Sequence, residues 1–141
     1  MSGKSSIDEF FKKQKEKVAK KQQEIAIVAL ISLFSKSPHA GEDYSKGEYD
    51  ANHKISINHK GGSSHHRATG SESNSKQFID NEIRKAKTIK CGDSVNIFNT
   101  TGHAKDVEYG KVVSSTWKKS GYYPYLQINN LLDQRYKDVI K

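Results

Sequence analysis

Histidines are the residues of this chain best suited to bind a metal, and their spacing decides whether they can. Six occur, and the closest candidates for a shared ion are His53 with His59 and the adjacent pair His65 and His66. Residues six apart on a strand lie about 20 Å from each other, which is too far for one ion. The adjacent pair has no carboxylate or third ligand nearby in the sequence. We therefore expect solvated histidines, with no metal and no cofactor.

Paired carboxylates could act as general acid and base, and Glu42 with Asp43 and Asp106 with Glu108 form such pairs. Both pairs lie among other charged residues, where solvated surface carboxylates explain them more simply. The sequence also lacks the Gly-x-Ser-x-Gly, His-Glu-x-x-His and Gly-x-x-x-x-Gly-Lys-Ser/Thr patterns and any Cys/His nucleophile arrangement. No catalytic residue is identified, and we expect a protein that is not an enzyme.

Basic and aromatic residues favour contact with a polyanion or with another protein. The chain has 24 Lys and Arg against 16 Asp and Glu, a net charge of +8. Lysines are dense from Lys12 to Lys21, and lysines and aromatic residues mix from Trp117 to Tyr125, which could suit phosphates and stacked bases. The same residues also suit a solvated helix and a protein interface. A small basic nucleic-acid-binding protein therefore stays open as an alternative function.

The size of the chain predicts one domain over residues 1–141 with a modest core. Only 33% of residues are hydrophobic and the mean hydropathy is -0.84, so burial against partner subunits would add stability. The single cysteine, Cys91, excludes an internal disulfide and fits a reducing compartment. The longest apolar run, Ile25 to Phe34, is well short of the roughly 20 residues that span a bilayer, so we expect no membrane anchor.

Hydrophobic periodicity predicts a long helix at the start of the chain. We place its cap at Ser5 or Ser6, with acidic residues in the first turn, and its end at Ser37-Pro38, because the residue before proline disfavours helix. The first half is rich in lysine and carries one narrow apolar stripe. That stripe consists of Ile7, Phe11, Val18, Ile25 and Ala29. We expect the first half to project along a surface or toward a neighbour, and the second half to be buried.

A strand and a mobile loop are expected after this helix. Residues 51–58 alternate, with Ala51, His53, Ile55 and Ile57 on the apolar or aromatic face. Residues 61–75 have almost no apolar content and cannot contribute to a core, so we expect a mobile loop there.

The rest of the chain completes an α+β arrangement. Asn74 or Ser75 can cap a central helix, whose apolar face consists of Phe78, Ile79, Ile83 and Ala86. A strand is expected over 93–99, a further strand over 111–114, and an amphipathic C-terminal helix from Pro124. We therefore expect a long N-terminal helix, a small mainly antiparallel sheet, a central helix and a C-terminal helix.

Residues 99–110 carry a motif that fits no catalytic or cofactor pattern. A strand ends at Asn99, a His103-Ala104 step follows, and Val107-Glu108-Tyr109-Gly110 closes the unit. In this motif, and in the order of its elements, the chain resembles the tail-completion family of long-tailed bacteriophages, which are minor tail or neck proteins. It departs from the family at Gly102-His103, where Pro-Tyr is usual, and in its longer turn over 40–47.

The resemblance implies a non-enzymatic structural virion protein that completes the tail or neck and supports head–tail joining. Copies would form a ring through heterologous contacts. Their partners would be other copies, other phage neck, tail or connector proteins, and packaged DNA through non-specific contact. The protein would be located in the virion after assembly in the host cytoplasm.

The resemblance also implies which residues matter. The motif positions, expected to be structural, are Pro38, Gly47, Asn99, Ala104, Glu108, Tyr109 and Gly110. Aromatic residues of the projecting helix and of the closing segment suit intersubunit or neck contacts. These candidate interface residues are Phe10, Phe11, Trp117, Tyr122, Tyr123 and Tyr125. The 61–75 loop could become ordered on assembly.

Overall fold

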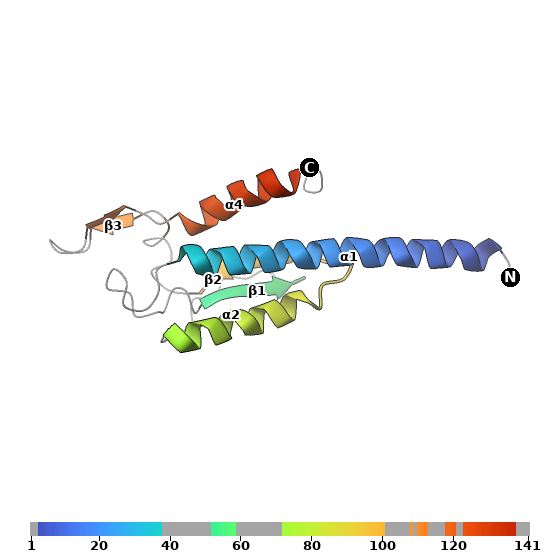
Figure 1. Ribbon diagram of the computed structural model, residues 1–141, viewed down its shortest axis with the longest axis horizontal. Helices are drawn as coiled ribbons and strands as arrows, with labels where there is room; N and C mark the ends of the chain where they lie inside the picture. Colours follow the sequence, from blue (N-terminus) through green and yellow to red (C-terminus); the bar gives the residue numbers. More distant parts are fainter. Residues whose placement is uncertain are drawn as a thin grey trace.

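The computed structural model describes residues 3–37, 52–58, 72–100, 108, 110–112, 118–120 and 123–137. The helices and strands in these ranges are α1 (Gly3–Lys36), β1 (His53–Ile57), α2 (Glu72–Ala86), β2 (Val95–Asn99), β3 (Gly110–Val112), β4 (Lys118–Ser120) and α4 (Pro124–Arg135). They form the expected α+β layout. The long helix α1 is the axis of the structure, with α4 along one side and β1, β2 and α2 along the other (Figure 1).

The strands β1 and β2 pair in antiparallel fashion, so that Ile55 lies opposite Ile97 and Ile57 opposite Val95. Alternation of side chains turns these four residues toward α1 and α2, where they pack on the core. At the other end of the ladder His53 lies opposite Asn99. The expected strands over 51–58 and 93–99 are therefore confirmed, each somewhat shorter than its periodic pattern.

One broad face of the C-terminal half of α1 is buried. Toward one side of this face, Ala26 and Leu30 pack with Ile55, Ala86 and Ile89 from β1, α2 and the turn after α2. Toward its other side, a second cluster consists of Ala29 and Leu33 with Ile128 of α4. Because residues three and four apart share a helix face, the two clusters are neighbours along the same stretch of α1.

The N-terminal half of α1 extends past the other described elements (Figure 1). Two glutamines of α1 bond to the turn after α2, at the point beyond which α1 projects. Gln23 Nε2 donates to the Ile89 carbonyl at 2.8 Å, and Gln22 Nε2 donates to the Asp93 carbonyl at 3.4 Å. The 19 residues before Gln22 span about 28 Å at the rise of an α-helix. The expectation that the first half projects and the second half is buried is confirmed.

Some predicted boundaries were wrong. The helix α1 begins at Gly3 rather than after a Ser5 or Ser6 cap, and no acidic residue stands in its first turn. The helix α2 begins at Glu72, inside the expected 61–75 loop and before the expected cap. Once packing has formed part of a helix, extending it by one turn costs little free energy. The cap residues in the sequence therefore did not set the first residue of α1 or of α2. The rest of that loop lies outside the described residues.

The expected strand over 111–114 is β3, and it pairs with β4 as a second two-stranded antiparallel sheet. That pairing was not predicted, because Lys118–Ser120 carries none of the β-branched or aromatic residues that mark a strand. The expected C-terminal helix is confirmed, with Pro124 as its first residue. None of the described helices is long and apolar enough to cross a membrane.

Candidate assembly surface and the polar junction behind it

Four polar side chains from four elements meet at the C-terminal end of α1, and we call them the polar junction: Ser37, His53, Asn99 and Tyr125. The ring of His53, fully buried, lies at the centre. Its Nε2 is 2.7 Å from Ser37 Oγ, and its Nδ1 is 3.0 Å from Tyr125 Oη and 3.3 Å from Asn99 Nδ2. The junction thus ties the end of α1 and the start of α4 to the sheet.

The hydrogen bonds assign the tautomer of His53. The Ser37 hydroxyl donates to the Leu33 carbonyl at 2.5 Å, so its oxygen accepts from the ring and Nε2 carries the hydrogen. Nδ1 is then the acceptor for the Tyr125 hydroxyl and the Asn99 amide. A ring nitrogen that donates to a serine cannot take the proton of that serine. In this arrangement the buried Ser–His contact holds the end of α1 against β1.

Burial keeps His53 neutral. Desolvation lowers the pKa of its ring from 6.5 to about 3, and the neighbouring charge of Lys54 adds to the effect. Because the ring is neutral, the hydroxyl and amide of the junction can both aim their hydrogens at Nδ1.

Asn52 and Thr100 extend the pairing of β1 and β2 by one residue pair beside the polar junction. The Thr100 backbone N–H donates to the Asn52 carbonyl at 3.1 Å, and the Thr100 hydroxyl donates to Asn52 Oδ1 at 3.2 Å. Both residues are buried, so these bonds satisfy polar groups that water does not reach.

Glu108 caps α4 from outside the helix. The Tyr125 and Leu126 backbone N–H groups donate to its two carboxylate oxygens at 3.1 and 3.0 Å, and its own carbonyl accepts from the Tyr123 N–H at 3.1 Å. The local cap position, Tyr123, has a left-handed backbone with φ 51° and offers no side-chain cap. A carboxylate at this site satisfies unpaired N–H groups and complements the helix dipole. Glu108 therefore fixes where α4 starts.

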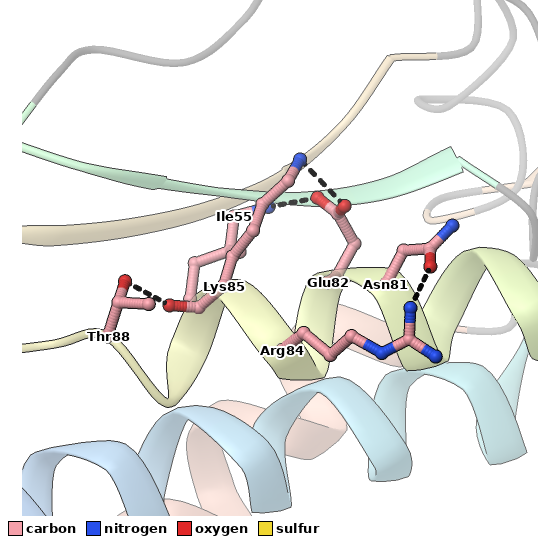
Figure 2. A network of polar contacts seen from close by, with 6 residues as sticks. All are labelled: Ile55, Asn81, Glu82, Arg84, Lys85 and Thr88. Carbon is pink, nitrogen blue, oxygen red and sulfur yellow. Dashed lines mark hydrogen bonds and ion pairs between the residues drawn. The ribbon is translucent and has the colours of Figure 1, made fainter.

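A second buried carboxylate, Glu82 of α2, holds β1 from the side away from β2 (Figure 2). Its Oε1 accepts the Ile55 backbone N–H at 3.0 Å, and its Oε2 pairs with Lys85 Nζ at 2.8 Å. Only 2% of Glu82 is exposed, so water does not reach this site. The Ile55 N–H, which has no partner on β2, is satisfied by the Glu82 carboxylate instead. Next to it, Asn81 accepts from Arg84, and Thr88 donates to the Lys85 carbonyl. These contacts hold α2 against β1.

Four exposed apolar residues lie on one face of the projecting half of α1, and we call them the α1 stripe: Ile7, Phe10, Phe11 and Val18. Between 47% and 57% of each residue is exposed. At 3.6 residues per turn the four fall within a sector about 100° wide. Ala29 continues the same sector toward the C-terminus, where Ile128 of α4 covers it. The stripe is thus the uncovered continuation of a packed helix face.

A groove of about 900 Å³ runs beside the stripe, between α1 and the turn after α2, and we call it the basic groove. Phe11, Ala19 and Ile89 give it apolar lining, and Cys91, whose side chain is exposed, lies at its edge. Its charged lining residues are Lys12, Lys15, Lys87, Lys90, Asp8 and Glu16. Four positive and two negative charges leave a net charge of +2 in the groove.

The structure describes part of the predicted residue set. Asn99 lies in the polar junction, Glu108 caps α4, and Gly110 opens β3. Phe10 and Phe11 lie on the stripe, Tyr123 is exposed before α4, and Tyr125 is half-buried on His53. The other predicted residues, which lie outside the described ranges, are Pro38, Gly47, Ala104, Tyr109, Trp117 and Tyr122.

Sequence reasoning missed Ser37, His53 and Glu82 as structural centres. A signal existed for two of them. His53 stands on the apolar face of its strand, and Glu82 lies on the same helix face as Ile79 and Ala86, where a solvated charge is unexpected. Ser37 gave no such signal, because its partner is 16 residues away.

No cluster of three or more histidines, cysteines or carboxylates that could hold a metal is found among the described residues. No family model, curated protein or solved structure matches the chain. The α1 stripe and the basic groove are the exposed surfaces on which the candidate assembly site is built.

Proposed function

We propose that this chain is a non-enzymatic structural protein of a bacteriophage virion that completes the tail or neck and supports head–tail joining. It acts by contacts between copies and with neighbouring neck, tail or connector proteins. The observation that carries the proposal is the α1 stripe, because a projecting helix with four large apolar side chains on one face is suited to association. The phage context comes from the resemblance in residues 99–110 and in the order of elements.

Burial of the stripe contributes part of the energy that association needs, since joining two proteins costs roughly 4–15 kcal/mol. Full burial of a large apolar side chain contributes roughly 1.5–3 kcal/mol, so covering four that are about half exposed contributes roughly 3–6 kcal/mol. Single exposed apolar residues are ordinary on protein surfaces, but a contiguous apolar face is typical of an interaction site. The stripe therefore suits burial against another protein.

The positions of Asn99 and Glu108 also support the proposal. Both belong to the motif that carries the family resemblance, and both make hydrogen bonds that tie separate elements together. Motif residues that stabilise the fold agree with a structural protein that functions through contacts with other proteins.

The alternative function, binding of nucleic acid by an isolated protein, rests on the lysines of α1. They are exposed along the projecting half, at Lys12, Lys13, Lys15, Lys17, Lys20 and Lys21. Such an array can follow a phosphate backbone, and its affinity would fall steeply as salt is raised. The assembly proposal requires no tight DNA binding by an isolated copy, so such binding would identify the alternative.

Deletion of the gene in the phage or prophage that carries it tests the proposal. Electron microscopy of the lysate is expected to show filled heads and separate tails in place of joined virions.

Complementation of the deletion should fail with I7S/F10S, which removes two stripe residues outside the basic groove. A matched control, I31S/L126S, changes two residues that are each 51% exposed but lie off the stripe, and it should restore virions. Joined, infectious virions from the deletion would overturn the proposal, as would equal failure of both variants.

A further inference from the structure

The basic groove presents positive charge at fixed positions. Gln23 Nε2 bonds to the Ile89 carbonyl, and Asp93 Oδ2 accepts the Lys90 backbone N–H at 2.7 Å, so the turn carrying Lys87 and Lys90 is held against α1. The ion pairs seen within the described ranges, Lys21–Glu24 and Lys85–Glu82, use none of the four groove lysines. A negatively charged occupant with an apolar component would complement this surface.

The chain itself contains a segment of that chemistry. Residues 42–50, Glu-Asp-Tyr-Ser-Lys-Gly-Glu-Tyr-Asp, hold four acidic residues, one lysine and two tyrosines, a net charge of -3. They lie outside the described residues, between the anchors Ser37 and Asn52. Carboxylates could pair with the groove lysines, while tyrosine rings suit both lysine ammonium groups and the Phe11 edge.

Tether length limits how far the segment reaches toward the outer lysines of its own groove. Asp43 is six residues from Ser37, so it reaches at most about 21 Å from that anchor, and Glu48 and Asp50 are closer to Asn52. Lys15 lies 22 residues before Ser37, which is about 33 Å along α1, and Lys12 is farther still. The two anchors are adjacent, because Ser37 contacts His53 at 2.7 Å. With side chains included, a fully extended tether brings the Asp43 carboxylate only to the limit of Lys15 and leaves it short of Lys12, so a segment from another molecule reaches these two lysines more readily.

We infer that the basic groove of one copy seats segment 42–50 of a second copy, so that copies join head to tail along α1. The inference rests on the proposed function, whose ring needs one heterologous interface, and it names the two surfaces of that interface. The groove and the described anchors of the segment, Ser37 and Asn52, lie toward opposite ends of α1. Each copy can therefore bind one neighbour through its groove and another through its segment.

Charge reversal tests the inference by sedimentation velocity over a concentration series. Wild-type protein is expected to self-associate. K12E/K15E turns the groove charge from +2 to -2 and should weaken association at least about tenfold, since several attractive pairs become repulsive. The matched control K13E/K17E makes the same charge change on the same helix at lysines that do not line the groove, and association should stay within about threefold of wild type.

A rescue identifies the partner surface. E42K/D43K changes the segment charge from -3 to +1 and should also prevent self-association, whereas a mixture with K12E/K15E should restore it. A wild-type monomer at every concentration, equal loss in the control, or no rescue in the mixture would overturn the inference. Equal weakening of DNA binding by both lysine pairs, without self-association, would identify a nucleic-acid surface instead. Virion complementation is scored separately, so failure here leaves the tail-completion proposal to be judged by its own assay.

Discussion

The buried histidine makes the stability of this protein depend on pH in a way that a single substitution can isolate. In the folded state the pKa of His53 is about 3, whereas an unfolded histidine titrates near 6.5. Between these values the unfolded state binds the extra proton, so stability falls as pH drops below 6.5 and is complete above it. Acidification from pH 7.5 to pH 5 is therefore expected to destabilise the fold.

The size of this effect follows from the 1.5 pH units between 6.5 and 5. At 1.36 kcal/mol per unit the loss is about 2 kcal/mol, and it depends little on the folded pKa as long as that pKa lies below 4. For a domain of this size the loss is a substantial share of a typical stability of about 5–15 kcal/mol. The carboxylates with lowered pKa, Glu24 and Asp93, contribute mainly in more acidic solution.

Urea denaturation at pH 7.5 and pH 5 measures the effect, with His53→Gln as the reference. Glutamine does not titrate, so the difference in pH dependence between wild type and H53Q isolates His53 and cancels every other histidine. We expect wild type to lose about 2 kcal/mol more than H53Q on acidification. Equal losses in both proteins, or an NMR titration of the His53 ring near pH 6.5, would refute a neutral, buried ring at the polar junction.

Three further substitutions test the core and the two buried carboxylates. Leu30→Ala removes a side chain with 0% exposure and should destabilise by about 2–5 kcal/mol in urea denaturation, whereas Ile31→Ala, at an exposed position, should have little effect. Glu108→Ala should destabilise by about 1–2 kcal/mol and speed hydrogen exchange in the first turn of α4, with protection in α2 unchanged. Glu82→Ala leaves the Ile55 N–H without its acceptor and should destabilise by about 1–3 kcal/mol, while E82Q keeps an acceptor and should lose less.

Periodicity and local stop signals predicted the elements well. The Ser37-Pro38 step places the end of α1, the alternation of Ile55 and Ile57 places β1, and Pro124 places the start of α4. Each of these signals acts within a few residues, through proline geometry or through the repeat of a buried face. Helix starts were predicted less well, because packing far from the start holds the first turn in place.

The contacts that join the elements could not be predicted from the sequence. Tyr125 meets His53 across 72 residues, and Glu108 reaches the start of α4 across 17. Periodicity shows that His53 faces inward, but it does not show which donors meet its ring. The projecting half of α1 was predictable, because a narrow apolar stripe among lysines is the pattern of a helix without a full set of packing partners.

The mass of the purified protein in solution, measured by light scattering over a concentration series with and without double-stranded DNA, tests the assembly claim most directly. The account predicts a discrete oligomer that forms as concentration rises, with a mass unchanged by DNA at physiological salt. A protein that stays monomeric at every concentration and binds DNA tightly, with an affinity that falls steeply as salt is raised, would contradict it and favour the nucleic-acid-binding alternative.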